Sequence, residues 1–106
     1  MLRTVQIDGR PGDTARYTAS DTATALPDAV LTNSVAECVG LLITVETYPV
    51  RIAFGVDPTQ GVGSVGHLLQ VGDVYKVAGN DLAAELQYIN ANNGANGVLQ
   101  ITPFYT

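Results

Sequence analysis

The stretch of sequence that decides the fold runs Val39-Gly-Leu-Leu-Ile-Thr-Val45. Every second residue in it is apolar, and the residues between are glycine, leucine and threonine. An alternation of period two predicts a β-strand with one face on a hydrophobic core. Leu42 on the opposite face indicates that this second face is partly covered as well.

The same alternation returns twice later in the chain. After the break at Tyr48-Pro49, Val50–Phe54 predicts a second strand, and the segment from Val98 predicts a closing strand. The apolar positions of these three segments form the predicted core, which consists of Val39, Leu41, Ile43, Val45, Val50, Ile52, Phe54, Leu99 and Ile101.

Shorter apolar segments separated by Gly, Pro, Asn and Asp turn residues predict further strands. These are Leu2–Ile7, Arg16–Ala19, Thr22–Leu26, His67–Gln70 and Val74–Val77. Asn80 is a candidate helix N-cap, which predicts one helical turn at Asp81–Ala84 followed by a strand. Many short strands at close spacing indicate one all-β domain over residues 1–106, an antiparallel β-sandwich of jelly-roll type with at most one short helical turn.

The surface of the chain is weakly charged. Asp, Glu, Lys and Arg make up 14% of residues, against roughly 25% in an average soluble domain. Because few ions must lose their water, such a surface is inexpensive to bury against a partner. The composition therefore favours a protein that packs against other proteins.

Charge and hydropathy also argue against two partner classes. The net charge is −5 and the five basic residues are scattered singly, whereas binding to a phosphate backbone needs clustered cations. We therefore expect no nucleic-acid partner. The longest apolar run, Cys38 to Ile43, is far shorter than the roughly 20 residues of a membrane span. We expect no membrane partner and, because no basic segment precedes an apolar stretch at the N-terminus, no signal peptide.

Two patterns suggest catalytic or cofactor chemistry, and both are better explained as structure. Gly61-Val-Gly-Ser-Val-Gly66 matches the dinucleotide-binding glycine pattern, but no helix of sufficient length follows it, so a flexible loop is favoured. Ser64 or Ser34 could join His67 and Asp73 in a hydrolytic triad, but nothing in the pattern supplies the rigid elbow or the oxyanion hole. We therefore predict no catalytic residues and no enzyme activity.

Metal and sugar sites are also not indicated. One histidine and one cysteine are too few for a zinc site, and no calcium loop is present, so we expect no metal and no cofactor. Cys38 is expected to be a buried, inert thiol. The five tyrosines could line a sugar-binding face, although packing in the core and at the edges is the favoured interpretation; they are Tyr17, Tyr48, Tyr75, Tyr88 and Tyr105.

Five motifs in order carry a resemblance to a known family. They are Thr22-Ala-Thr-Ala-Leu-Pro27, Cys38–Ile43, Val50–Gly55, Gly66–Asp73 with its Gly-Asp ending, and Val98–Phe104. The chain resembles the small β-sandwich proteins encoded among the structural genes of tailed bacteriophages. The match covers about residues 18 to 105, and each motif is also ordinary β-sheet chemistry. The chain departs from the pattern by a longer loop at Asp57–Gly66.

The resemblance implies a structural protein of the virion. A capsid decoration (cement) subunit that binds the shell is the first expectation, and a head–tail, neck or baseplate component is the next. The rival is a carbohydrate-binding or adhesion module displayed on the particle, which an exposed cluster of tyrosines beside Asn or Asp would favour. We expect a homo-oligomer, most simply a trimer, with the strands Leu2–Ile7 and Val98–Tyr105 as sheet edges held at subunit interfaces.

Overall fold

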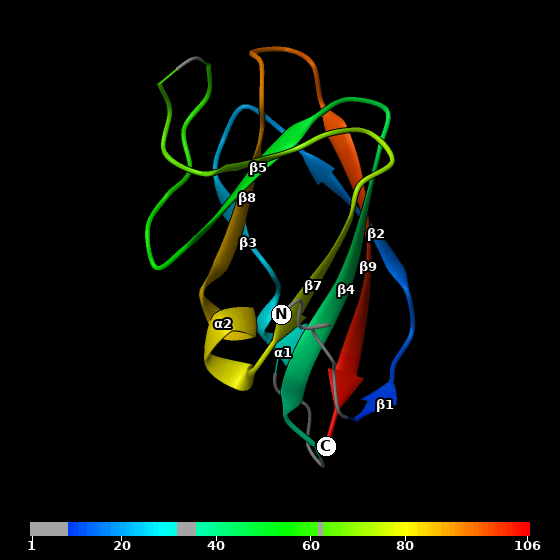
Figure 1. Ribbon diagram of the computed structural model, residues 1–106. Helices are drawn as coiled ribbons and strands as arrows, with labels where there is room; N and C mark the ends of the chain where they lie inside the picture. Colours follow the sequence, from blue (N-terminus) through cyan, green and yellow to red (C-terminus); the bar gives the residue numbers. More distant parts are fainter. Residues whose placement is uncertain (1–8, 32–35, 62) are drawn as a thin grey trace, which may run out of the picture.

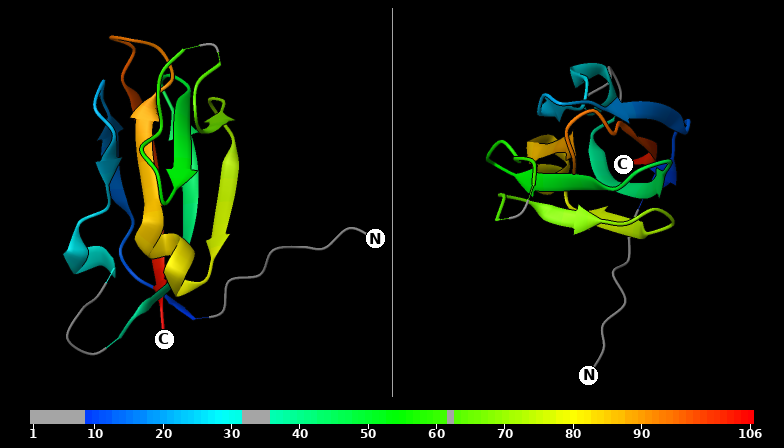
Figure 2. Two further views of the ribbon diagram at one scale, coloured as in Figure 1. Left: turned by 90° about the vertical axis from the view of Figure 1, so that its left-hand side faces the viewer. Right: turned by 90° about the horizontal axis from the view of Figure 1, so that it is seen from above.

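The computed structural model describes residues 9–31, 36–61 and 63–106 of the chain. Two antiparallel sheets pack face to face, and two short helices lie at one end of the molecule (Figures 1 and 2). In chain order the elements are β1 (Arg10–Pro11), β2 (Ala15–Ala19), β3 (Thr24–Ala25), α1 (Asp28–Leu31), β4 (Cys38–Glu46), β5 (Val50–Phe54), β6 (His67–Leu69), β7 (Val74–Ala78), α2 (Asn80–Glu85), β8 (Leu86–Asn90) and β9 (Gly97–Tyr105).

The strand order is that of a jelly roll. Sheet 1 runs β2-β9-β4-β7, with β1 pairing with the other end of β9, and sheet 2 runs β3-β8-β5-β6. Most connections cross from one sheet to the other, so neighbours within a sheet are distant in the sequence. Two four-stranded layers wound in this way form the double Greek key of the jelly roll. The predicted all-β sandwich is confirmed.

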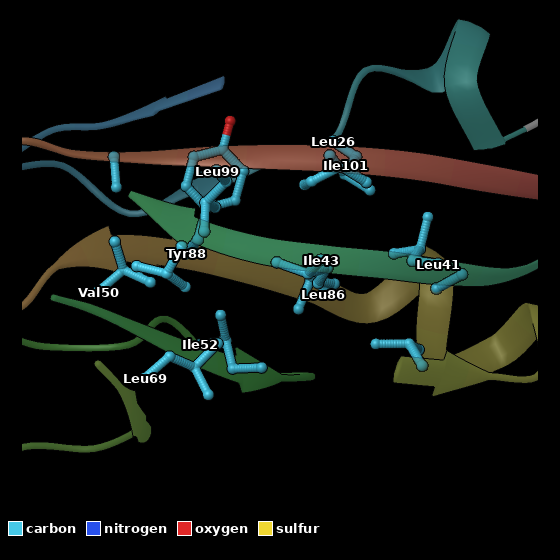
Figure 3. Packing of buried hydrophobic residues seen from close by; sticks show 14 of the residues in the cluster. Leu26, Leu41, Ile43, Val50, Ile52, Leu69, Leu86, Tyr88, Leu99 and Ile101 are labelled. Carbon is cyan, nitrogen blue, oxygen red and sulfur yellow. The ribbon is translucent and has the colours of Figure 1, made fainter. Parts of the chain in front are cut away.

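The core lies between the two sheets. Apolar side chains from both inner faces meet there (Figure 3). The predicted core residues that are buried are Leu41, Ile43, Val45, Val50, Ile52, Leu99 and Ile101. Leu86 and Tyr88 of β8 and Cys38 of β4 complete the same cluster. Burying one large aliphatic side chain contributes about 1.5–3 kcal/mol, so this layer holds the sheets together.

Two predicted core residues are only partly buried. In β4 the register shifts between Cys38 and Gly40, where a β-bulge interrupts the pairing with β9. The extra residue reverses the alternation, so Cys38 faces the core and Val39 does not. Phe54, the last residue of β5, packs against the rim of the core.

The helical content exceeds the prediction. The expected turn is present as α2, which leads directly into β8, but its N-cap is Gly79 and not Asn80. A second helix, α1, was not predicted, so "at most one short helical turn" is wrong. This helix is one turn that begins at Asp28, and the N–H of Val30 donates to the carbonyl of Pro27.

The placement of the terminal strands also needs correction. The C-terminal strand β9 is not an edge, because it lies between β4 on one side and β1 and β2 on the other. Alternation alone cannot separate a central strand from an edge strand. The predicted strand Leu2–Ile7 lies outside the described residues. The segment Thr22–Leu26 forms only the two-residue strand β3.

Candidate functional site

The residues considered for a hydrolytic triad do not form one. The Ser64 hydroxyl donates to the carbonyl oxygens of Gln60 and Gly61, the latter at 2.6 Å. The Asp73 carboxylate accepts from the backbone N–H of Gln70 at 2.8 Å. His67 is exposed on β6 and makes no side-chain hydrogen bond to the described residues. Ser34 lies outside the described residues.

The glycine pattern lies in the loop between β5 and β6. Gly61, Gly63 and Gly66 all have positive φ, and the strand β6 follows them where a dinucleotide site would have a helix. The sequence interpretation as a loop is confirmed. Over the described residues, no group of three or more His, Cys, Asp or Glu side chains is placed to hold a metal ion.

The remaining candidates are packing residues. Cys38 is buried at 2% exposure, and its thiol donates to the carbonyl of Gly40. Among the tyrosines only Tyr48 is exposed, so the described chain has no exposed tyrosine cluster of the kind that a sugar-binding face was expected to show. The rings of Tyr17 and Tyr88 pack at 6.4 Å between the sheets. Burial raises the pKa of Tyr88, with a smaller contribution from Tyr17.

A network of polar side chains lies at the opposite end of the sandwich from the helices, at the top of Figure 1. Its centre is Asn90, the last residue of β8, which is fully buried. The Asn90 amide donates to Asp21 at 2.7 Å and to Asn96 at 3.0 Å, and its oxygen accepts from Gln60. Three loops are therefore joined through one buried amide, which is tolerated because both its donor and its acceptor are satisfied.

Asp21 is the acceptor that completes this network. Its Oδ1 also accepts from the Gln60 amide at 3.0 Å and from the backbone N–H of Gly94 at 2.8 Å. The bond from Asn90, followed by those from Gly94 and Gln60, holds the pKa of Asp21 below its ordinary value of 3.8. All three bonds favour the charged carboxylate.

A dependence of stability on pH follows from this network. Because the pKa of Asp21 is lower in the folded state, its ionisation stabilises the fold above 3.8, and the contribution is lost as the pH falls through the folded-state pKa. Asp21→Asn keeps an acceptor oxygen and removes the ionisation. We expect the variant to be less stable than wild type near neutral pH, and the difference to shrink below pH 3.8.

Urea unfolding across this pH range measures the difference. The control is Asp57→Asn, because Asp57 is exposed and its side chain makes no hydrogen bond or ion pair with the described residues. A difference between Asp21→Asn and wild type that stays constant with pH would show that Asp21 acts only as a neutral acceptor.

The β5–β6 loop, described at residues 55–61 and 63–66, folds back against the outer face of sheet 2. Arg51 of β5 lies on this face, because its neighbours Val50 and Ile52 point into the core. Its guanidinium donates through Nη1 to the carbonyl of Gly66 and through Nη2 to that of Gly61, both at 3.2 Å. The N–H of Gly61 in turn donates to Ala91 at 3.0 Å. These bonds hold the loop to β5 and to the end of β8.

A hollow of about 340 Å³ opens beside Arg51. It is lined by Pro49, Arg51, Gly61, Leu68, Gln70, Ala91 and Asn92. Arg51 is the only charged group among these residues. Leu68 is 43% exposed and provides an apolar wall. We call this the Arg51 hollow; it shares the β5–β6 loop and the end of β8 with the Asn90 network.

A second, smaller hollow of about 130 Å³ lies at the helical end, between α1, α2 and the start of β4. Glu37 and Asp81 are among its lining residues, beside Cys38. Its lining has two carboxylates and no cation, so it would repel an anionic ligand.

Sequence reasoning did not identify Arg51 or Asn90 as functional candidates. Asn90 has a recognisable signal, because it follows Leu86 and Tyr88 at the core-facing positions of β8, where a polar residue needs buried partners. Arg51 has no such signal in the sequence. An outward-facing arginine is common on a strand, and only the loop that folds over Arg51 distinguishes it.

No described helix is long and apolar enough to cross a membrane. When the chain is compared with known proteins, no family model, no curated protein and no solved structure matches it.

Proposed function

We propose that this chain is a non-enzymatic structural protein of a tailed-phage virion, a capsid decoration subunit that assembles with its own copies on the shell. It is made in the host cytoplasm and resides in the virion. The sequence resemblance supports the phage assignment. The observation that carries the structural role is an apolar edge of the sandwich, which we call the β6–β7 edge and define as residues 67–78.

Strands β6 and β7 are the last strands of their sheets on the same side, because the short turn at residues 70–73 joins them. Among the described strands, each pairs on one side only, β6 with β5 and β7 with β4. Unpaired N–H and C=O groups on an edge strand are available to a neighbouring chain. In the right-hand view of Figure 2 these two strands run along one side of the molecule.

This edge also exposes apolar side chains. Leu68 is 43%, Val71 52% and Val74 61% exposed. The five-residue strand on the other side, β2, exposes no large apolar side chain. The β6–β7 edge also carries the exposed polar residues His67, Asp73 and Lys76. Exposed apolar surface on a small domain typically marks a protein interface. The β6–β7 edge therefore supports association with protein partners, and pairing with a second copy is the simplest arrangement.

Light scattering at micromolar concentration tests this proposal. We expect the wild-type chain to form a closed oligomer, with a trimer as the first expectation. Val74→Lys places a charge on the edge at a side chain that the fold does not bury, and should shift the chain toward monomer. Thr18→Lys, which adds the same charge on β2, should not.

Co-sedimentation with purified tailed-phage capsids tests the shell contact. Wild type should bind in a saturable manner, and Val74→Lys should bind more weakly because it lacks the oligomer. A monodisperse wild-type monomer that does not bind capsids would contradict the virion role.

A further inference from the structure

The Arg51 hollow contains a cation that has no counter-ion among the residues that the structure describes. The guanidinium has five N–H groups, and the fold uses one on Nη1 and one on Nη2, both toward neutral carbonyls. Arg51 forms no ion pair with the described residues. The Nε atom is buried and has no hydrogen-bond partner in the described part of the chain. Arg51 thus retains unused donors and an uncompensated positive charge.

Partial burial makes this charge costly for the isolated protein. Burying a cation without a counter-charge is unfavourable, since the lost hydration is not replaced. An anion bound in the hollow would compensate the positive charge of Arg51. The two carbonyl bonds fix the plane and position of the guanidinium, so a ligand would meet a group that is already oriented.

The rest of the hollow offers groups for a polar, non-aromatic ligand. Gln70 and Asn92 line it, and neither side-chain amide is engaged by the described residues. Leu68 and Pro49 add apolar surface beside them. A volume of about 340 Å³ lies at the small end of the range of ligand pockets, roughly 300–1,000 Å³.

We propose that the Arg51 hollow binds a small carboxylated sugar of the uronic-acid class. The carboxylate pairs with the guanidinium of Arg51, the hydroxyls bond to the Gln70 and Asn92 amides, and the C–H face of the ring packs on Leu68. A carboxylate fits better than a phosphate because, as a monoanion, it is repelled less by a chain of net charge −5. Leu68 and Gln70 also belong to the β6–β7 edge, whereas Arg51 and Asn92 lie outside it.

Titration of the isotope-labelled chain with glucuronate, followed by ¹H–¹⁵N correlation spectra, tests the proposal. We expect saturable shifts at the amides of Gly61, Leu68, Ala91 and Asn92. A dissociation constant on the order of 1 mM is expected for such a small, open site. Glucose should bind at least about tenfold more weakly, because it lacks the charged group. Inorganic phosphate should bind more weakly than glucuronate and compete with it.

Variants distinguish specific binding by Arg51 from a general effect of the charge of the chain. Arg51→Gln should weaken glucuronate binding by about tenfold or more, and Arg16→Gln, which removes the same charge from exposed β2, should leave it unchanged. Asn92→Ala removes an amide that the fold does not use, and should weaken binding by about threefold to tenfold. If the spectrum of Arg51→Gln shows an unfolded chain, binding to Asn92→Ala tests the proposal instead.

Several results would overturn the inference. These are the absence of saturable shifts with glucuronate, equal shifts with glucose, tighter binding of phosphate, equal weakening in Arg16→Gln, and unchanged binding in Asn92→Ala. Light scattering measures oligomerisation separately.

Discussion

Ile43→Ala is expected to lower the free energy of unfolding by about 2–5 kcal/mol, because it removes a large side chain from a close-packed core. Ile43 is fully buried in β4 and pairs with Ile101 on one side and Tyr75 on the other. It belongs to the cluster that joins the two sheets (Figure 3). Since a domain of this kind has only about 5–15 kcal/mol of stability, the variant should unfold at much lower urea concentration.

Two substitutions calibrate this result. Ile43→Val keeps most of the side chain and should cost about 0.5–1.5 kcal/mol. Val74→Ala, on the exposed edge of the same sheet, should stay within about 0.5 kcal/mol of wild type. Urea unfolding monitored by circular dichroism, at concentrations below oligomer formation, gives all three values. Equal effects for Ile43→Ala and Val74→Ala would show that the packing between the sheets is wrong.

Deletion of Phe104–Thr106 is expected to destabilise the monomer by about 3 kcal/mol or more, because it removes several hydrogen bonds worth about 1 kcal/mol each. Tyr105 pairs with Cys38 and Arg10 in the sheet, and its hydroxyl donates to the carbonyl of Val30 at 2.7 Å. Thr106 exchanges two further bonds with Glu37. The deletion therefore opens β4, β1 and the end of α1 together.

The single variant Tyr105→Phe isolates one part of this loss. It removes only the bond to Val30 and should cost about 1 kcal/mol. Thermal and urea unfolding measure both changes. If the deletion altered oligomer size and left the unfolding midpoint of the monomer unchanged, the end of β9 would belong to an interface and not to the fold.

The class of fold could be predicted because the alternation in β4, β5 and β9 is a local property of the chain. Alternating apolar residues that can face a core predict a strand, and this pattern is present in Val39–Val45 and Val50–Phe54. The bulge at Cys38 and the central position of β9 could not be predicted, since both depend on the partner strand. The helix α1 was missed because one turn of four residues is too short for helical periodicity to show.

The candidate site was less predictable than the fold. Its groups come from the turn after β2, from β5, from the β5–β6 loop and from the end of β8, and they meet only when the loops close over one end of the sandwich. Arg51 and Asp21 are 30 positions apart and share no sequence pattern. The sequence motifs singled out Ser64 and His67. Ser64 donates to loop carbonyls, and His67 is exposed and makes no side-chain hydrogen bond to the described residues.

The location of β9 within sheet 1 has a consequence for biosynthesis. The ribosome makes β9 after all the other described strands. Strand β2, which lies more than 70 residues earlier in the sequence, can pair only once β9 has been made. Until residues 97–105 leave the exit tunnel, no strand lies between β2 and β4, so sheet 1 cannot close before that point. Contacts between distant parts of a chain also form slowly. The nascent chain therefore exposes unpaired strands until synthesis reaches β9, and this interval is when chaperones would matter most for its yield.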